Sequence, residues 1–336
     1  MEIHHNINKL SLGARGAVVA IGNFDGVHRG HQAVIAQARA QADALGAPLG
    51  VMTFEPHPRA FFAPSTPPFR LTPLAAKARE LALLGVDHLY AVGFDRAFAA
   101  ISAHDFIAKV LAENLGAVSV VVGGDFQFGR GREGDILFLQ REAPGFGIQL
   151  SRVVPVTVES GPIASRRIRE LLTLGELDAA ADLLGRRWEM EGPVVHGDKL
   201  GRTIGYPTAN IDLGDMLRPK IGIYAVEVLI EGETYWRDGV ASLGYRPTVG
   251  GRDLRFEVNL FDFTGDLYGR TLRVRPIKYL RDEVSLDGLE ALKQKIAEDV
   301  VEARAALKSL AHGKVDGGGG INNKSSLRTV PPQGGR

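Results

Sequence analysis

The chain has 336 residues, of which 45% are hydrophobic, and this is enough apolar material for the cores of about two domains. Its 40 basic and 39 acidic residues leave a formal net charge of +1, so charge gives no reason to expect a nucleic-acid or membrane partner. Cysteine is absent, which excludes disulfides and thiolate metal sites and fits a reducing compartment. With no apolar signal-peptide core and no apolar run of about eighteen residues, we expect a cytoplasmic protein.

Strand-like and helix-like segments alternate along the first half of the chain. Apolar runs rich in valine and isoleucine predict the strands, and segments with helical spacing of apolar residues separate them. The predicted strands are residues 17–21, 49–54, 88–92, 118–122 and 148–153, and the predicted helices are residues 32–45, 74–84, 105–114 and 133–141. This alternation predicts an α/β fold with a Rossmann-like parallel sheet, covered by helices on both faces, in which ligands bind at the carboxyl ends of the strands.

A dense motif follows directly after the first predicted strand. Its members are Gly22, Asn23, Phe24, Asp25, Gly26, His28, Gly30 and His31. The glycines allow a ligand to come close to the backbone, and the N-terminus of the next helix offers free N–H groups to a phosphate. His28 and His31 are three residues apart, so both imidazoles lie near one helix face and can donate to a triphosphate. For the His-x-Gly-His tetrad alone, two surface histidines at a helix start are the alternative.

Other loops of the first half are less specific. Residues 123–129 also follow a predicted strand, and they form either a second loop of the same crevice or an ordinary glycine turn. Residues 129–134 match a G-x-G-x-x-G pattern, but no strand leads directly into them, so we reject a dinucleotide site there. Ser165 is a natural N-cap for a helix whose first turn is rich in arginine and includes Arg167 and Arg169. An anionic ligand would offset these cations, and a solvated basic face is the alternative.

The pattern changes near Gly185, after two short helical segments at residues 166–173 and 177–184. From there strand follows strand, at residues 188–195, 223–230, 234–240, 254–263 and 271–277. This succession predicts an antiparallel β-barrel, closed by a helix for which Ser285 is a possible N-cap. The tail lacks periodicity and is expected to be disordered. The predicted domains are residues 1–185 and 186–312, and the tail is residues 313–336.

A second dense motif lies in the barrel half. It begins with the glycines and cations of a phosphate-sized loop, namely Gly197, Lys199, Gly201, Arg202 and Gly205. Thr208 and Asn210 follow, two residues apart, and their hard oxygen atoms suit Mg²⁺ bound together with phosphates. A polar β-turn is the alternative. No G-x-x-x-x-G-K-[ST] sequence occurs, so phosphoryl transfer by this chain would not use a P-loop.

The first motif, GNFDGVHRGH, resembles the nucleotide-binding signature of nucleotidylyltransferases. In its full length it is similar to the N-terminal half of the bacterial bifunctional riboflavin kinase/FMN adenylyltransferase family. The second motif, built around Pro207-Thr208-Ala209-Asn210, resembles that family's riboflavin kinase signature, and the resemblance covers residues 15 to 310. It implies that the N-terminal domain adenylylates FMN with ATP to give FAD and pyrophosphate. It also implies that the barrel phosphorylates riboflavin with ATP to give FMN.

The resemblance further implies site residues. For adenylyl transfer it implies catalytic His28 and His31, with ATP or FMN contacts from Gly22, Asn23, Phe24, Asp25, Gly26, Gly30, Asp125, Phe128, Ser165, Arg167 and Arg169. For phosphoryl transfer it implies Glu257 as general base on the ribityl 5′-hydroxyl and Mg²⁺ at Thr208 and Asn210. The same resemblance implies ATP or flavin contacts from Gly197, Lys199, Gly201, Arg202, Gly205, Arg281 and Glu283. From strand alternation alone, Glu257 would be an ordinary outward-facing residue.

The chain departs from the family's pattern at a few positions. Ala164 and Arg166 stand where Ser and Thr are usual, Ser242 stands where Asn is common, and Asn259 stands where His is common. Two alternatives therefore stay open: a riboflavin kinase with an inactive N-terminal domain, and a non-catalytic flavin-binding regulator. The expected partners are ATP, riboflavin and FMN, with Mg²⁺ as cofactor. No nucleic acid or membrane is expected, and a homo-oligomer is left open.

Overall fold

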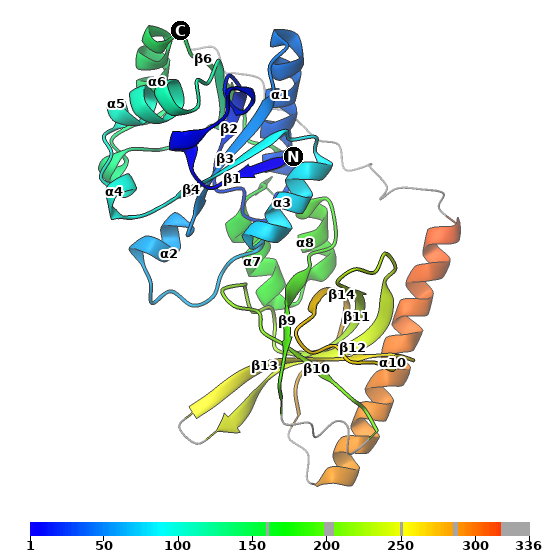
Figure 1. The fold of residues 1–336 in the computed structure, drawn as a ribbon. Coiled ribbons are helices and arrows are strands. Elements are labelled where there is room, and N and C mark those ends of the chain that lie inside the picture. Colours follow the sequence, from blue (N-terminus) through cyan, green and yellow to red (C-terminus); the bar gives the residue numbers. More distant parts are fainter. Residues whose placement is uncertain (159–160, 198–204, 249–250, 285–287, 317–336) are drawn as a thin grey trace. The chain divides into compact units, whose positions relative to one another are not determined.

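The chain forms two compact units, each with its own buried apolar cluster or clusters (Figure 1). The computed structural model describes residues 1–158, 161–197, 205–248, 251–284 and 288–316. The N-terminal unit is Met1–Ser165, and the C-terminal unit begins at Arg166.

The N-terminal unit is built on a six-stranded sheet in the order β1-β4-β3-β2-β5-β6. Its strands are β1 (Glu2–His4), β2 (Val18–Ile21), β3 (Leu49–Glu55), β4 (His88–Gly93), β5 (Ser119–Gly123) and β6 (Gln149–Val153). Every adjacent pair is parallel, which confirms the predicted architecture. The chain passes from β2 to β3 on one side and later to β5 on the other side of β2. The carboxyl end of β2 is therefore the switch point at which open α/β sheets bind ligands.

Helices cover both faces of this sheet, and the residues of β2 show it. Val18 and Ala20 belong to one buried cluster, whereas Val19 and Ile21 belong to another. The helices are α1 (Arg29–Leu45), α2 (Pro58–Phe62), α3 (Leu74–Leu83), α4 (Arg96–Ala99), α5 (Ala103–Asp105), η3 (Phe106–Asn114) and α6 (Ile136–Glu142). Residues of α1 and α3 pack into the first cluster, and residues of η3 and α6 pack into the second.

Two features of this unit differ from the sequence-based expectation. Strand β1 was not predicted, because three residues are too few to show a period of two. The predicted helix at residues 105–114 is mostly the π-helix η3. A segment of nine residues has too few apolar positions to distinguish π-helical spacing, with hydrogen bonds between residues five apart, from α-helical spacing, with bonds between residues four apart.

The C-terminal unit contains a closed barrel in the order β10-β13-β12-β11-β14-β9. Its strands are β9 (Met190–Val195), β10 (Ala209–Ile211), β11 (Gly222–Ile230), β12 (Arg237–Thr248), β13 (Gly251–Leu260) and β14 (Thr271–Arg281). All the adjacent pairs are antiparallel, as predicted. The three-residue β10 was not predicted, and β12 begins three residues later than the predicted residue 234.

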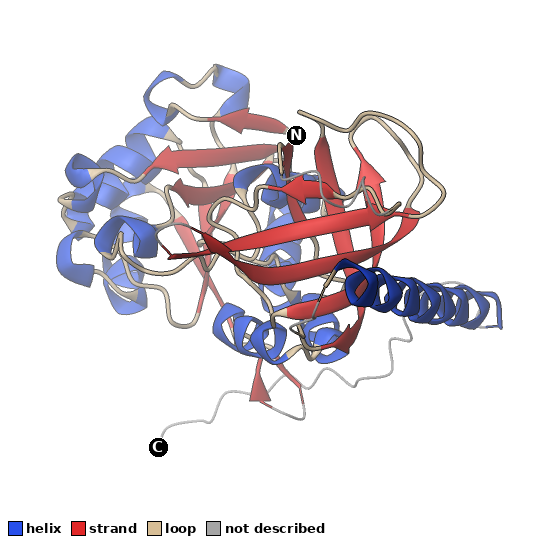
Figure 2. Cartoon of the chain, turned by 90° about the horizontal axis from the view of Figure 1, so that it is seen from below, coloured by secondary structure: helices blue, strands red, loops and turns tan. Residues whose placement is uncertain are grey.

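Among the described residues of the C-terminal unit, three helices accompany the barrel: α7 (Ser165–Leu174), α8 (Leu177–Leu184) and α10 (Leu289–Asp316). Figures 1 and 2 show α10 lying along the barrel strands, and Ala303 and Leu307 pack there against Ile223 and Ala225 of β11. The helix continues to Asp316, so the predicted tail does not begin at Gly313 as expected; the first four of its residues are helical. The candidate N-cap Ser285 and the remaining tail, 317–336, lie outside the described residues.

Helices α7 and α8 group with the barrel. The backbone N–H of Lys220 donates to the Leu172 carbonyl at 3.0 Å, and a Cβ on Gly175 would lie 3.0 Å from the Lys220 side chain. Along the chain, the boundary between the two compact units falls after Ser165, whereas the sequence pattern changes at Gly185. An independent domain beginning at residue 186 stays a prediction.

We expect the ion pair between β14 and α10 to stabilise the barrel. The Arg281 guanidinium binds Asp299 through two hydrogen bonds of 2.7 and 2.6 Å, and Asp299 is only 5% exposed. Asp299→Asn should lower the free energy of unfolding by about 3 kcal/mol, because it leaves a largely buried guanidinium without its counter-charge. Both tryptophans, Trp188 and Trp236, lie in the C-terminal unit, so their fluorescence during urea unfolding measures this effect.

The matched control is Asp262→Asn. Asp262 pairs with Arg304 of the same helix at 2.9 Å, but both side chains are exposed, so this substitution should leave the unfolding curve nearly unchanged. Equal effects of the two substitutions would show that the Arg281–Asp299 pair does not hold α10 in place.

Candidate functional site

The loop after β2 has a strained backbone. The φ angle is +47° at Phe24 and +43° at Val27, a left-handed conformation that is unfavourable for a β-branched residue. Both side chains are 1% exposed and belong to the cluster under α1 and α3. Packing therefore holds the loop in a shape that the local sequence alone would not prefer.

Asp25 fixes this loop to a neighbouring segment. Its Oδ1 atom accepts hydrogen bonds from the backbone N–H groups of Leu71 at 2.9 Å and Thr72 at 3.0 Å. The Thr72 hydroxyl in turn accepts from the N–H of Gly26 at 2.9 Å. The Ser165 hydroxyl donates to the Asp25 carbonyl oxygen at 2.8 Å. At 2% exposure, Asp25 has the contacts of a residue that positions the loop, and Ser165 adds one more hydrogen bond to it.

His28 and His31 lie together at the start of α1. His28 is the N-cap, and its Nδ1 accepts from the N–H of His31 at 3.2 Å. The two rings stack with centroids 3.6 Å apart and planes inclined by 15°. Glycine is favoured at position 30, because a Cβ there would crowd the His28 ring at 3.1 Å and the Ile163 carbonyl oxygen at 3.4 Å.

The environment of His31 keeps its ring neutral. Desolvation lowers the pKa of His31 well below its usual value of 6.5, and the nearby His28 and Lys77 lower it further. The buried Nδ1 of His31 has no hydrogen-bond partner in the part of the chain that the structure describes. A neutral imidazole beside a helix N-terminus can donate a hydrogen bond to an incoming phosphate from its N–H group.

A buried charge network lies beneath this loop and was not predicted. The Lys77 ammonium, 1% exposed, donates to the Thr53 hydroxyl at 3.0 Å and lies 3.5 Å from a Glu55 oxygen. Thr53 donates to the Asn23 carbonyl oxygen at 3.1 Å, and Glu55 pairs with Arg70 at 2.8 and 2.5 Å. Burial lowers the pKa of Lys77. The sequence held a signal, since Lys77 lies on the apolar face of the predicted helix at residues 74–84, where lysine is rare.

The loop after β5 reaches the same edge of the sheet. Asp125 is exposed there, whereas Phe128 is 7% exposed and packs on Phe106 with ring centroids 5.1 Å apart. Phe128 and Gly134 also exchange two backbone hydrogen bonds of 3.0 Å, which confirms that the G-x-G-x-x-G match is a loop. Phe128 thus has the contacts of a core residue, and of the two predicted ligand contacts Asp125 is the accessible one.

The barrel site is built on strand register. Asn210 of β10 lies opposite Glu257 of β13, and Glu257 lies opposite Ser242 of β12. Directly opposed residues project to the same face, with Cβ atoms about 5 Å apart. All three are half-buried and alternate with buried neighbours such as Phe256 and Val258, so they form a row on the outer face of the barrel.

The segment around this row is tightly packed. A Cβ on Gly197 would lie 2.2 Å from Asn210 Nδ2, so glycine is required beside this amide. Asn259 donates to the Pro207 carbonyl oxygen at 2.7 Å and so fixes the Pro-Thr segment to β13. Gly205 has a φ of +86°, which favours glycine. The predicted phosphate-loop residues Lys199, Gly201 and Arg202 lie outside the described residues.

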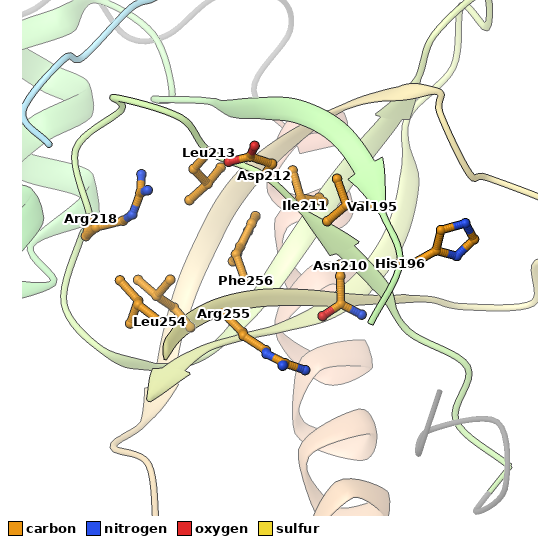
Figure 3. A pocket seen from close by; sticks show the side chains of 11 residues that line it. Val195, His196, Asn210, Ile211, Asp212, Leu213, Arg218, Leu254, Arg255 and Phe256 are labelled. Carbon is orange, nitrogen blue, oxygen red and sulfur yellow. The ribbon is translucent and has the colours of Figure 1, made fainter. Parts of the chain in front are cut away.

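Two cavities flank β10. One, of about 230 Å³, is lined by Asn210, His196, Arg218 and Arg255, together with apolar side chains such as Phe256 (Figure 3). The three basic side chains of this cavity were not predicted. The other cavity, of about 290 Å³, is lined by Thr208, Val258, Phe263, Tyr268 and their neighbours. Thr208 and Asn210, predicted to share one ion, therefore line different cavities.

Two of the remaining predicted contacts, Arg281 and Glu283, have partners within the C-terminal unit. Arg281 is held by Asp299, as described above, and Glu283 accepts from the N–H of Tyr245 at 3.3 Å. Gly244 leaves the space that the Glu283 carboxylate occupies, since a Cβ there would lie 1.8 Å from it. Arg167 and Arg169 belong to α7 in the C-terminal unit. The ligand contacts proposed for these four charged residues stay predictions.

Comparison with known proteins also divides the chain into two parts. Residues 11–167 match the FAD synthetase family, and residues 184–307 match the riboflavin kinase family. The bifunctional riboflavin kinase/FMN adenylyltransferase of Escherichia coli K12 is 43% identical over 305 residues, which covers 90% of this chain and 97% of that protein. The protein of the same name from Pseudomonas fluorescens is 42% identical, covering 93% and 100%, and that from Bacillus subtilis is 37% identical, covering 85% and 91%.

A solved structure is also similar. The crystal structure of a protein described as a macrolide-efflux protein from Streptococcus pneumoniae has a TM-score of 0.77 at 34% identity, covering 90% of this chain and 98% of that one. Among the residues that our structure describes, no helix combines the length and apolar character that a membrane crossing needs. On the strength of the two family matches and of relatives that align along nearly their whole length, this chain belongs to the bifunctional riboflavin kinase/FMN adenylyltransferase family.

Proposed function

We propose that the chain makes FAD from riboflavin in two ATP-dependent steps, one in each unit. The barrel transfers the γ-phosphoryl group of ATP to riboflavin and gives FMN. The N-terminal unit transfers the adenylyl group of ATP to FMN and gives FAD and pyrophosphate. The observation that carries the proposal is that each family match contains its own assembled group of functional residues. One is the His28–His31 pair at the switch point, and the other is the Asn210–Glu257 pair on the barrel.

In adenylyl transfer, a phosphate oxygen of FMN attacks the α-phosphorus of ATP, and the bond to pyrophosphate breaks. Negative charge develops on the phosphoryl oxygens, and preorganised donors stabilise it. The neutral His31 acts as a hydrogen-bond donor, because burial disfavours its cation. His28 uses Nδ1 as an acceptor within the helix cap, so in its neutral tautomer Nε2 carries the proton that a phosphate can accept. The free N–H groups of α1 add the positive end of the helix dipole.

The alternative of an inactive first unit rests on Ala164 and Arg166. Both residues are exposed, and the Arg166 guanidinium pairs with Glu170 of the next turn at 2.9 Å. Ser165, between them, keeps its contact with the Asp25 carbonyl oxygen. The departures from the family's pattern therefore leave the loop, the histidine pair and the support under them in place, which favours an active adenylyltransferase.

In phosphoryl transfer, Glu257 is the general base that accepts the proton of the ribityl 5′-hydroxyl. The oxygen donors beside it fit Mg²⁺, which binds proteins through one or two oxygen ligands and otherwise through substrate phosphates and water. Asn210 supplies an amide oxygen in register with the Glu257 carboxylate. Thr208 lines the other cavity, so its hydroxyl as a second ligand of the same ion stays a prediction. When bound, Mg²⁺ neutralises charge on the transferred phosphoryl group. The basic side chains of the cavity that Asn210 lines can bind phosphate oxygens.

Replacing His28 should stop FAD synthesis selectively. His28→Asn keeps a good helix N-cap but removes the imidazole, so we expect the rate of FAD formation from FMN to fall by about 100-fold or more. FMN formation from riboflavin should continue at the wild-type rate. Chromatographic separation of riboflavin, FMN and FAD measures both steps in one reaction. The exposed His104→Asn serves as the control, and equal loss of both steps in folded His28→Asn protein would refute separate sites.

Replacing Glu257 or Asn210 should have the opposite effect. Glu257→Gln keeps the shape of the side chain but removes the base, so phosphorylation of riboflavin should fall by about 100-fold or more. Asn210→Ala should raise the Mg²⁺ concentration needed for half-maximal kinase activity. FMN supplied directly should still become FAD in both variants. The exposed Glu290→Gln is the matched control, and normal kinase turnover in Glu257→Gln would remove the proposed base.

The half-buried His31 should make the N-terminal unit sensitive to acid. In the unfolded chain a histidine titrates near its usual pKa of about 6.5, whereas in the folded unit the pKa of His31 is lowered. The unfolded state therefore takes up the proton first, and stability present above pH 6.5 is lost as the pH falls from there toward the folded pKa. Hydrogen-exchange protection of the β2 amides between pH 7.5 and 5.5 measures it. His31→Gln should flatten the decline and His104→Gln should not; the same slope in all three proteins would contradict the assignment.

A cytoplasmic location stays a prediction, and a homo-oligomer stays an open alternative.

A further inference from the structure

Three side chains at the edge of the parallel sheet converge on one point. The Nε2 of His4 lies 3.1 Å from the Nδ1 of His88. The Oε2 of Glu2 lies 3.6 Å from the first of these nitrogens and 3.7 Å from the second. These are the three pairwise distances among the same three atoms. Two imidazole nitrogens and one carboxylate oxygen therefore form a nearly equilateral triangle.

The size of this triangle matches the ligand set of a tetrahedral metal ion. Zinc binds histidine nitrogens and carboxylate oxygens at about 2.0–2.2 Å, and two such ligands at the tetrahedral angle are about 3.3–3.6 Å apart. Two histidines and one carboxylate are also a known zinc ligand set, in which the fourth position holds water. The Glu2 side chain is 70% exposed, so solvent can supply that fourth ligand.

Strand register builds the triangle. Glu2 and His4 alternate along β1 and therefore project to the same face, and His88 of β4 lies directly opposite Glu2. The ring of Tyr90, opposite His4, stacks at 5.5 Å on His4 and at 6.2 Å on His88. His88 is 9% exposed, so the backbone and an aromatic neighbour hold the ligands in position before any ion arrives.

The charges and lone pairs of these three side chains suit a metal cation. An imidazole nitrogen that carries no proton can coordinate a metal ion. Two imidazole nitrogens 3.1 Å apart can share one hydrogen bond or can both face an ion, and the Glu2 carboxylate supplies the compensating negative charge.

We propose that Glu2, His4 and His88 form a binding site for a divalent transition-metal ion, with Zn²⁺ as the best-fitting ion, that fastens β1 to the edge of the sheet. The strand β1 has three residues and one neighbour, so little else holds it in place. The site lies where β4 begins, whereas the His28–His31 pair lies at the carboxyl end of β2. The ion is therefore structural, and it takes no part in either transfer reaction.

Calorimetric titration of the full-length, untagged, metal-free protein with Zn²⁺ in the absence of nucleotide tests the proposal. We expect one zinc site. Glu2→Gln and His4→Asn should each raise its Kd by about tenfold or more. His5→Asn is the matched control, because His5 is the exposed neighbour of His4 and should leave the Kd unchanged. Glu2 is exposed, so its variant does not threaten folding.

Two further readouts separate this site from other histidines. Co²⁺ in place of zinc should give the visible absorption of a tetrahedral site, and His4→Asn should abolish it. Zinc at 100 times its Kd should raise the hydrogen-exchange protection of β1 amides about 100-fold in the wild type and not in His4→Asn. Three results would each overturn the proposal: no zinc binding by the wild type, wild-type affinity in Glu2→Gln and His4→Asn, or loss of binding in His28→Asn.

Discussion

The hydrogen bonds accepted by the Asp25 carboxylate are the interaction on which the adenylyltransferase site depends. A carboxylate taken out of water must be compensated, and here two backbone N–H groups from another segment do so. Their directions fix Asp25, and with it a loop whose backbone is held at positive φ at Phe24 and Val27. The loop in turn sets where α1 begins. His28 can cap that helix and stack on His31 only because the helix begins at this point.

Support for this loop comes from beneath as well. Lys77, Thr53 and Glu55 place a buried cation, a hydroxyl and a carboxylate under the peptide of Asn23. Buried charges are costly unless they are paired, so such a network is retained where position matters more than stability. It also acts on chemistry, because the Lys77 charge contributes to the lowered pKa of His31. One network therefore positions the loop and sets the protonation state of its second histidine.

The kinase site depends on a different constraint, which is strand register. Shifting β10 by one residue would move Asn210 from the Glu257 row to the opposite face of the barrel. Two features oppose such a shift. The Asn259 amide donates to the Pro207 carbonyl oxygen, and the Asn210 amide occupies the space that a Cβ on residue 197 would need. Asn259, which stands where the family commonly has histidine, thus keeps a positioning role in this chain.

The sequence by itself determined the order and type of the long elements, the sheet and barrel architectures, and the motifs that mark both sites. Hydrophobic periodicity and glycine-rich breaks are local properties, and they suffice to place a motif at the end of a strand. The sequence could not supply β1 or β10, because three residues show no period. Only the tertiary structure showed that Asp25, Phe128 and Arg281 are engaged with the protein itself, and that Lys77 and Arg218 lie at the sites. Hydrophobic periodicity shows that a face is buried but not which distant segment covers it. The partner of Arg281, Asp299, lies 18 residues away in the sequence, and Leu71, which donates to Asp25, lies 46 residues away.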